Sequence, residues 1–437
     1  MNITFIGTGY VGLVSGIMMS YIGHNVTCLD TDSFKISQLK KNILPIYEPA
    51  LDEYLLPLIN SGTLHFTDRY SSELQNSQVV FITVGTPPLE TGEADLQYIF
   101  AAIDNLYQWL NSGCLIVIKS TVPPTTCNQI IDYLYKKKYQ FNVASNPEFL
   151  REGKAVYDFL SPDRILIGTN NKYSEEILKQ IYLPLTSQGV ELISTDIVTA
   201  ELAKYAANAF LATKIALTNE MADLCEKVGA NINDIALTVG ADKRIGKAFL
   251  NAGPGFGGSC FPKDLAALSA TAKKYQLDCT ILDSVICSNE QRPFNMVDKI
   301  SDIIGGNLEN KNFTILGLTF KADTDDIRSS PAIKIMKILL DAGANVKAFD
   351  PMGIDNTKRE LQDLKYKNLF YCDSALSACQ NSDIILITTE WLEFRNLDFV
   401  QIRSYNPIII DLRNLLDPKQ LETLGFKYYR LGIKDGI

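Results

Sequence analysis

The feature that most constrains the fold is a three-glycine turn near the N-terminus, Gly7-Thr-Gly-Tyr-Val-Gly12. A short apolar run, residues 3–6, precedes the turn, and a helical pattern follows it. A second apolar run, residues 25–29, then ends at Asp30. In this order the pattern is a dinucleotide-binding fingerprint, in which the glycines admit the pyrophosphate to a helix N-terminus and the acid binds a ribose. The sequence therefore predicts a Rossmann-like, doubly wound α/β domain.

The acid at the end of the second run also indicates which dinucleotide is bound. Asp30 favours a free ribose 2′-hydroxyl, which points to NAD rather than NADP, although Lys35 leaves NADP open. Capping of the next helix is the alternative role for Asp30, and the spacing favours it less. The residues predicted to contact NAD in this region are Gly7, Gly9, Val11, Gly12, Asp30 and Lys35.

The C-terminal part of the chain repeats this plan. Residues 343–350, which end in Asp350, match residues 23–30 in spacing, and residues 381–388 resemble residues 76–83. We therefore predict a second Rossmann-like domain. Its first turn, residues 317–321, lacks the three glycines but carries Lys321, with Arg328 close behind. A phosphate-bearing ligand other than a dinucleotide fits these cations, and two solvated surface cations are the alternative.

Between the two repeats, residues 196–229 form one helical pattern without proline, roughly 50 Å long. Lys204 and Asn208 share a face of this helix, where a buried lysine must be paired or used, unless its amine reaches solvent. At 437 residues the chain is long enough for about three domains. The expected fold is α/β: two Rossmann-like domains, 1–195 and 301–437, joined by a long central helix and a helical middle domain, 196–300.

A second glycine-rich stretch, Gly253 to Asp264, presents a thiol. Glycines let the backbone lie against a ligand. Cys260 is followed by Lys263 and Asp264, and a nearby ammonium favours the nucleophilic thiolate. A buried structural cysteine is the alternative. The loop context makes Cys260 the predicted covalent catalyst.

Polar residues also follow three predicted strands, at residues 79–84, 114–119 and 141–145. They are Thr86, Thr121 and Glu148. Ligands bind outside the carboxyl ends of the strands in a doubly wound sheet, so these side chains should gather over one crevice. For any one of them alone, capping or turn formation explains the residue equally well.

Composition excludes several classes of protein. The net charge is −9 without a long basic run, which argues against nucleic acid and anionic membranes as partners. The nine cysteines include no Cys-x-x-Cys pair, which argues against a zinc knuckle and for a reducing, cytoplasmic location, and no metal is expected. The two histidines lie outside any motif, so proton transfer must use Lys, Asp, Glu, Thr or water. The uncharged residues 3–23 are not expected to form a signal peptide or membrane span, because glycines interrupt them and no Lys or Arg precedes them.

Together these stretches resemble the UDP-glucose/GDP-mannose dehydrogenase family over essentially the whole chain. The motifs that carry the resemblance are Gly7–Gly12, Val84–Pro87, Asn146–Gly153, Glu201–Asn208, Arg244–Gly246, Gly255–Asp264 and Gly317–Lys321. The sequence departs from the family pattern in two places. Pro124-Thr125 stands where a small residue and glycine are common, and Ser329 stands where glutamate is common.

The resemblance implies a four-electron oxidation of UDP-glucose to UDP-glucuronate by two NAD+, through a thiohemiacetal and a thioester on Cys260. The catalytic residues it implies are Cys260, Lys204, Asn208, Asp264, Glu148 and Thr121. Further cofactor contacts are Thr86, Thr121, Glu152, Lys263 and Arg328. The implied substrate contacts are Glu148, Phe149, Leu150, Arg151, Glu152, Lys204, Asn208, Arg244, Phe249, Leu250, Asn251, Ala252, Gly253, Gly257 and Lys321. It also implies a homodimer built on the long helix, with Arg244 reaching a neighbouring subunit.

Three other functions stay open. A two-electron β-hydroxyacid dehydrogenase shares the Rossmann domain and the Lys-x-x-x-Asn helix, but needs neither Cys260 nor a third domain. The same four-electron chemistry could act on GDP-mannose or UDP-N-acetylmannosamine. A catalytically silent nucleotide-sugar binding protein is disfavoured by the intact Cys260, Lys204 and Asp264.

Overall fold

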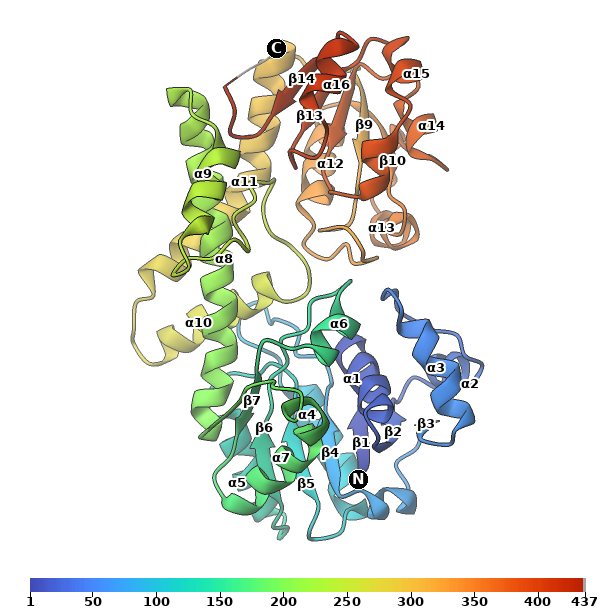
Figure 1. Ribbon diagram of the computed structural model, residues 1–437, viewed down its shortest axis with the longest axis vertical. Coiled ribbons are helices and arrows are strands. Elements are labelled where there is room, and N and C mark those ends of the chain that lie inside the picture. The colour runs from blue at the N-terminus through green and yellow to red at the C-terminus, as the bar shows by residue number, and fades with distance from the viewer. Residues whose placement is uncertain (435–437) are drawn as a thin grey trace. The chain divides into compact units, whose positions relative to one another are not determined.

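The computed structural model of the protein describes residues 1–434 and divides into two compact units (Figure 1). Unit 1 comprises Met1–Ala207 and Ala266–Leu277, and unit 2 comprises Asn208–Leu265 and the chain from Asp278 onward. Each unit contains one sheet, as the two Rossmann-like repeats predict. The three-domain division into 1–195, 196–300 and 301–437 stays a prediction.

The sheet of unit 1 has eight strands in the order β3-β2-β1-β4-β5-β6-β7-β8. All neighbours pair in parallel except β6 and β7, which are antiparallel. The strands are β1 (Asn2–Ile6), β2 (Asn25–Leu29), β3 (Leu64–Thr67), β4 (Val79–Ile82), β5 (Leu115–Ile118), β6 (Asn142–Ser145), β7 (Ile165–Gly168) and β8 (Leu192–Thr195). Because β4, β5 and β7 are buried along their whole length, they read as unbroken apolar runs.

Helices cover both faces of this sheet, and two hydrophobic clusters fill the space between. One cluster includes Leu13, Val14 and Ile17 of the first helix, and the other includes Ile99 and Ile103. The helices are α1 (Tyr10–Tyr21), α2 (Ser33–Lys40), α3 (Leu51–Asn60), α4 (Gln97–Leu106), α5 (Thr126–Lys136), α6 (Ala155–Leu160) and α7 (Lys172–Thr186), with 3-10 turns η1 (Ser72–Asn76) and η2 (Tyr107–Trp109).

The sheet of unit 2 has six parallel strands in the order β11-β10-β9-β12-β13-β14. The strands are β9 (Asn312–Leu316), β10 (Asn345–Phe349), β11 (Leu369–Tyr371), β12 (Ile384–Ile387), β13 (Ile408–Asp411) and β14 (Lys427–Arg430). The helices beside them are α12 (Pro331–Asp341), α13 (Ile354–Leu361), α14 (Ala375–Cys379), η3 (Leu392–Asn396), α15 (Phe399–Arg403) and α16 (Pro418–Thr423).

The helical middle region contains the long helix expected over residues 196–229. Helix α8 (Ile197–Val228) has 32 residues and passes from unit 1 into unit 2, whereas α10 (Phe261–Lys274) begins in unit 2 and ends in unit 1. Helices α9 (Ile232–Ala241) and α11 (Thr280–Ile304) belong to unit 2. The predicted α/β fold, with two Rossmann-like sheets and a helical middle region, is confirmed. Among the residues described, no helix combines the length and apolar character that a membrane crossing needs.

Candidate active site

The turn after β1 fits a dinucleotide pyrophosphate. A Cβ atom on Gly12 would lie 1.9 Å from the Gly7 carbonyl oxygen and 2.4 Å from Thr83 Oγ1, so only glycine fits there. Gly9 caps α1 without a side-chain hydrogen bond, and nothing lies within 4 Å of the place its Cβ would take. The first N–H groups of α1 are therefore approachable by a phosphate, as the fingerprint predicts.

Asp30 lies at the end of β2, where the ribose acid is expected. Its Oδ2 accepts hydrogen bonds from Thr8 N (2.7 Å) and Thr8 Oγ1 (2.8 Å), and Lys35 Nζ lies 3.3 Å away. Burial opposes ionisation, but hydrogen bonds from the Asp32 and Thr8 backbones and the charge of Lys35 outweigh it and lower the pKa of Asp30. Asp32, not Asp30, caps α2, which removes the capping alternative.

A buried carboxylate that sequence reasoning missed links this turn to the loop after β6. Glu48 accepts hydrogen bonds from the Tyr10 hydroxyl and from the backbone N–H groups of Gly153 and Ala155, the latter two at 2.7 Å each. Burial and the adjacent Glu48 raise the pKa of Tyr10. Glu48 thus ties the first residue of α1 to the segment that carries Glu148 and Glu152. In the sequence, nothing distinguishes Glu48 from a solvent-exposed glutamate in a loop.

The carboxyl ends of β4, β5 and β6 meet as predicted. Thr86 Oγ1 donates to the Thr121 carbonyl oxygen at 2.9 Å. Lys119 Nζ donates to Asn146 Oδ1 at 3.2 Å, and Tyr182 donates to the same oxygen. Thr86 is buried, so these loops form an ordered rim along the edge of the sheet in unit 1.

Two buried lysines accompany one buried carboxylate at this rim. Lys204 Nζ lies 3.5 Å from Glu148 Oε1, and each side chain is only 5% exposed. The second lysine is Lys119: burial lowers its pKa to about 8, the charge of Glu148 raises it and that of Lys204 lowers it further. Sequence reasoning missed Lys119, although a lysine ending a buried apolar strand was a usable signal.

Other residues predicted in this loop are held by local contacts. Lys204 Nζ lies 5.0 Å from the centre of the Phe149 ring, and the Leu150 backbone N–H donates to Glu148 Oε2 at 2.6 Å. Arg151 forms an ion pair with Asp158 at 2.5 Å, and burial of that carboxylate fixes the turn before α6.

In unit 2, Cys260 immediately precedes α10. Its half-buried sulfur lies 3.5 Å from Ser259 Oγ, and its carbonyl accepts the Asp264 N–H at 2.8 Å. Asp264 is 1% exposed and accepts hydrogen bonds from Asn208 Nδ2 and Lys263 Nζ, each at 2.6 Å. The structure therefore gathers Cys260, Lys263, Asp264 and Asn208, all predicted from sequence, around the first turn of one helix.

The loop that precedes Cys260 packs against the turn between β9 and α12. A Cβ on Gly257 would lie 2.5 Å from the Ser329 carbonyl oxygen, and Gly258 N donates to the Arg328 carbonyl oxygen at 2.8 Å. Arg328 itself forms a two-point ion pair with Asp326, and Lys321 Nζ lies 5.4 Å from the Phe320 ring centre. This turn thus supports the thiol loop and carries both predicted cations.

The start of the loop contains the predicted segment Phe249–Gly253. Leu250 and Ala252 are buried, Asn251 is exposed, and the Phe249 ring lies 6.0 Å from that of Phe261. Arg244 lies before this segment, with its side chain 89% exposed and paired with Asp242.

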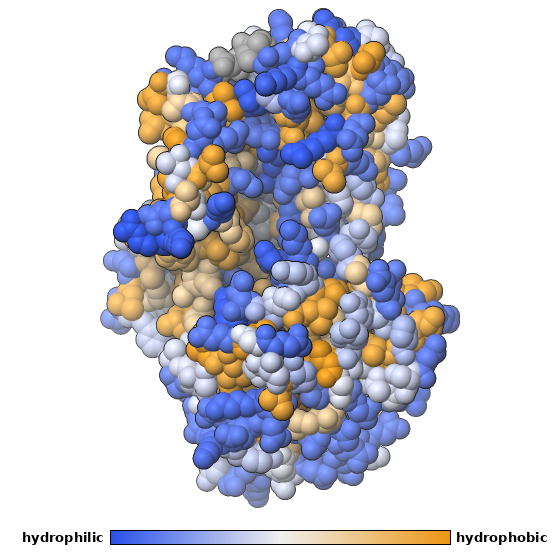
Figure 2. Space-filling model, viewed as in Figure 1, coloured by the Kyte–Doolittle hydropathy of each residue, from blue (hydrophilic) through white to orange (hydrophobic). Residues whose placement is uncertain are grey.

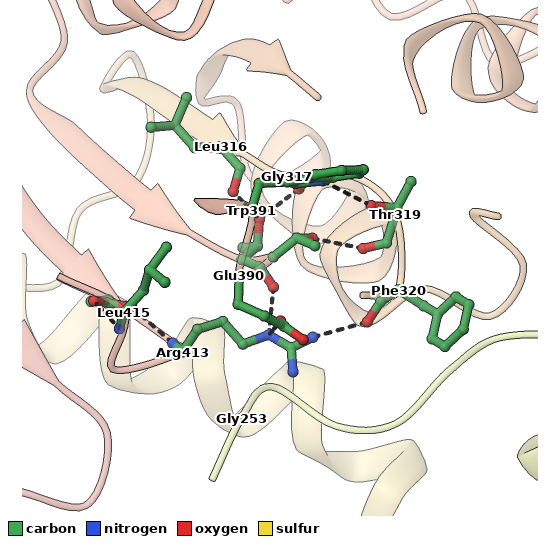
Figure 3. A network of polar contacts seen from close by, with 12 residues as sticks. Gly253, Leu316, Gly317, Thr319, Phe320, Glu390, Trp391, Arg413 and Leu415 are labelled. Carbon is green, nitrogen blue, oxygen red and sulfur yellow. Dashed lines mark hydrogen bonds and ion pairs between the residues drawn. The ribbon is translucent and has the colours of Figure 1, made fainter. Parts of the chain in front are cut away.

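Arg413, which sequence reasoning missed, lies beside Gly253 in the close-up of the polar network (Figure 3). Its Nε donates to the Thr388 carbonyl at 2.9 Å and its Nη2 to the Phe320 carbonyl at 3.0 Å, with Glu390 as ion-pair partner. The remaining nitrogen, Nη1, would lie 3.0 Å from a Cβ on Gly253. Arg413 follows the buried strand β13 by two residues, which is the signal that could have indicated it.

Three family models match the chain. The NAD binding domain of the UDP-glucose/GDP-mannose dehydrogenase family matches residues 1–186, the central domain residues 198–291, and the UDP binding domain residues 314–418. The chain is 60% identical over 436 residues to UDP-glucose 6-dehydrogenase of Rickettsia felis, covering 99% of this chain and 97% of the relative. It is 43% identical over 442 residues to UDP-glucose 6-dehydrogenase of Rhizobium meliloti, covering both chains fully.

A solved UDP-glucose dehydrogenase from the archaeon Pyrobaculum islandicum has a TM-score of 0.90 and 33% identity, covering 99% of this chain and 98% of that one. A solved UDP-D-ManNAc dehydrogenase from Pyrococcus horikoshii has a TM-score of 0.86 and 27% identity, with both chains fully covered.

Proposed function

Because the chain belongs to the UDP-glucose/GDP-mannose dehydrogenase family, we propose that it oxidises C6 of UDP-glucose twice, giving UDP-glucuronate. The cofactor is NAD, whose binding domain covers residues 1–186, and each NAD+ accepts one hydride. The observation that carries the proposal is the Cys260 thiol at the start of α10, beside the Asp264 carboxylate that holds Asn208 and Lys263.

In the first oxidation the C6 hydroxyl loses its proton and C6 loses a hydride, which leaves an aldehyde. Lys204 and Asn208, one turn apart on α8, supply N–H donors for the developing negative charge on the oxygen. Lys204 is already neutralised by Glu148 at 3.5 Å, so its burial is tolerated before substrate binds.

The second oxidation needs covalent capture. The Cys260 thiolate adds to the aldehyde carbon, and the carbonyl electron pair moves to oxygen and takes a proton, forming a thiohemiacetal. A helix N-terminus favours negative charge, so the start of α10 supports the thiolate. Loss of the second hydride from C6, together with the proton of the thiohemiacetal hydroxyl, gives a thioester. Water, placed by Glu148, Asp264 and Thr121, then breaks the carbon–sulfur bond and restores the thiolate.

The remaining roles are proposed on the same basis. Thr86, Glu152, Lys263 and Arg328 contact the cofactor with the β1 turn, Asp30 and Lys35. Phe249–Gly253, Gly257, Lys321 and the segment Glu148–Glu152 contact UDP-glucose. Arg413 joins them, because its Nη1 approaches Gly253.

We also propose a cytoplasmic homodimer. Helix α8 carries apolar side chains with large exposed fractions at a seven-residue spacing: Phe210 (72%), Leu217 (56%) and Leu224 (51%). Exposed apolar residues also occur on α9, including Leu237, and orange surface appears over α9 in Figure 2. Such a patch favours burial against a second copy, to which exposed Arg244 would contribute.

The cytoplasmic location is supported by the cysteines. All nine are free thiols, which suits a reducing compartment.

The test is to follow NADH with UDP-glucose, GDP-mannose and UDP-N-acetylmannosamine in parallel. We expect two NADH per UDP-glucose and little turnover of the other two. Cys260→Ala should still bind UDP-glucose and produce no uronate. A yield near one NADH in the wild type, or normal turnover in Cys260→Ala, would refute the covalent four-electron reaction.

A further inference from the structure

Asn289 on α11 holds the backbone of the thiol loop in a way that no sequence motif indicated. Its Oδ1 accepts the Phe256 N–H at 2.8 Å, and its Nδ2 donates to the Phe256 carbonyl at 3.0 Å. One side-chain amide therefore satisfies both backbone groups of a loop residue, as a neighbouring strand would. The residue it holds lies four positions before Cys260.

The loop is shaped to receive this amide. Gly255 has φ +123°, and a Cβ there would lie 3.0 Å from Asn289 Oδ1. A larger residue would be strained in its backbone and would press on the amide oxygen. Gly255 and the side-chain amide of Asn289 are therefore complementary in shape.

A shift of the Phe256 backbone can be transmitted to Cys260 through two aromatic rings. Phe256 is buried, and its ring packs edge to face on that of Phe261 with centres 5.9 Å apart. Phe261 directly follows Cys260 and is the first residue of α10. Because the rings interlock, displacement of the Phe256 backbone displaces the residue next to the sulfur.

The sugar-nucleotide end of the loop is held by different residues. The Gly253 N–H donates to Asn219 Oδ1 at 2.8 Å, and the Gly253 carbonyl accepts from Arg292 Nε at 3.2 Å. Asn219 lies on α8 and Arg292 on α11, and both are buried. Loss of the Asn289 amide therefore leaves the Gly253 end anchored.

We propose that Asn289 is a positioning residue for the thiol step: it acts through Phe256 to aim Cys260 at the aldehyde. This inference rests on the proposed function. Without Asn289 the first hydride transfer continues, since it needs no sulfur. The thiol then captures the aldehyde poorly, and part of the aldehyde leaves the enzyme before the second oxidation.

The experiment measures NADH formed per UDP-glucose consumed, with a hydrazide reagent present to trap aldehyde. In Asn289→Ala the yield should fall from two toward one, with trapped aldehyde making up the difference. Uronate formation should drop about 10-fold to 100-fold, the scale of a misplaced reacting group, while KM for UDP-glucose changes less than about 2-fold. Asn295→Ala, which removes an exposed amide from the same helix, is the matched control and should keep a yield of two.

Each outcome is decisive. A yield of two with no trapped aldehyde in Asn289→Ala overturns the inference, and so does a large rise in KM without aldehyde release. If the wild type itself gives one NADH, the proposed function fails instead, whatever Asn289 does. Should Asn289→Ala not fold, judged by its melting curve and NAD binding, Asn289→Asp decides. It keeps the acceptor for Phe256 N–H but loses the donor, so its yield should lie between one and two.

Discussion

Asp30 and Asp350 occupy the same place in the two sheets and are used in different ways. Each follows the strand next to the first strand of its sheet, β2 in unit 1 and β10 in unit 2. Asp350 is 1% exposed, and its Oδ2 accepts from Leu318 N, Thr319 N and Oγ1, and Trp391 Nε1. Its Oδ1 accepts from the backbones of Met352 and Gly353. Asp30 has fewer donors and keeps capacity for a ribose hydroxyl.

The turns beside Asp30 and Asp350 also differ, and only the turn in unit 1 leads directly from a strand into a helix. In unit 1, α1 begins at Tyr10, directly after the glycine turn that follows β1. In unit 2, a long loop separates the end of β9 at Leu316 from α12, which begins at Pro331. A phosphate can reach a helix N-terminus beside the strand only in the first case. The shared strand–acid plan serves a dinucleotide in unit 1 and holds a loop in unit 2.

A second pair of residues repeats this contrast. The fifth strand of each shared pattern, β5 or β13, has a buried ionisable group at its carboxyl end: Lys119 or Asp411. Asp411 accepts from the backbones of Leu415 and Leu416 and from the Tyr428 hydroxyl. Lys119 Nζ has one hydrogen-bond partner in the described part of the chain, Asn146. Asp411, whose role is structural, has several hydrogen-bond donors around its buried carboxylate. Lys119, which lies at the proposed site, has fewer hydrogen-bond partners than its buried ammonium group can bind.

The largest effect is expected from removal of the acid in unit 2. Asp350→Ala leaves several buried N–H donors without an acceptor, so we expect the free energy of unfolding to fall by about 4 kcal/mol. Urea denaturation measures the loss. A destabilisation below about 1 kcal/mol would show that Asp350 is not the structural counterpart described here.

The matching change in unit 1 should affect binding as well. Asp30→Ala is expected to weaken NAD about 10-fold, since one charge-assisted hydrogen bond to the ribose is lost. Its free energy of unfolding should fall by about 2 kcal/mol, less than in Asp350→Ala, because the two Thr8 donors are buried whereas the Asp32 N–H is exposed to solvent. Titration of NAD by calorimetry gives the first quantity. Equal stability losses in the two variants would erase the distinction between the acids.

The sequence predicted those parts of the molecule that depend on local pattern. The apolar runs at residues 3–6 and 25–29 are found as β1 and β2 within one residue, and the long helix begins and ends one residue inside its predicted bounds. Strand-end polar residues such as Thr86 and Thr121 were identified because parallel strands end at one edge. The family resemblance added the roles.

Lys119 and Arg413 were missed although each follows the end of a buried strand, whereas Glu48 and Asn289 could not be predicted in this way. Each acts on a backbone or side chain far away in the sequence: Glu48 on Gly153, and Asn289 on Phe256. A loop glutamate or a helical asparagine has no local signature that distinguishes it from a solvated residue. Only tertiary structure shows that these polar groups are partly or fully buried and paired.

Lys119→Met tests the contrast between Lys119 and Asp411, because its effect on stability should depend on pH. Burial lowers the pKa of Lys119 from its ordinary value of 10.5 to about 8, so the unfolded chain binds more protons than the folded protein between these values. Stability of the wild type therefore rises as the pH rises through this window. We expect Lys119→Met to be more stable by roughly 3 kcal/mol at pH 7, with the advantage vanishing near pH 10.5.

Unfolding curves at a series of pH values test this, with Asp411→Ala as the counterpart. Asp411→Ala should lose stability at pH 7, because it leaves the Leu415 and Leu416 N–H groups without their acceptor. An advantage of Lys119→Met that does not change with pH would mean that folding does not lower the pKa of Lys119.

The smallest expected effects come from the two places where the sequence departs from the family pattern, one in each unit. Thr125 has φ +77° and Ser329 has φ +51°, and both are in the left-handed region that favours glycine. A β-branched residue is strained there by about 1–2 kcal/mol, of which the entropy of glycine in the unfolded chain returns about 0.5–1 kcal/mol. Thr125→Gly should therefore stabilise the protein by about 1 kcal/mol, and the strain at Thr125 is tolerated because its N–H donates to buried Glu201 at 2.7 Å. Serine is not β-branched, so Ser329→Gly should be close to neutral in the same urea titration. A larger gain for Ser329→Gly would mean that the turn supporting Gly257, not the turn before α5, holds the greater backbone strain.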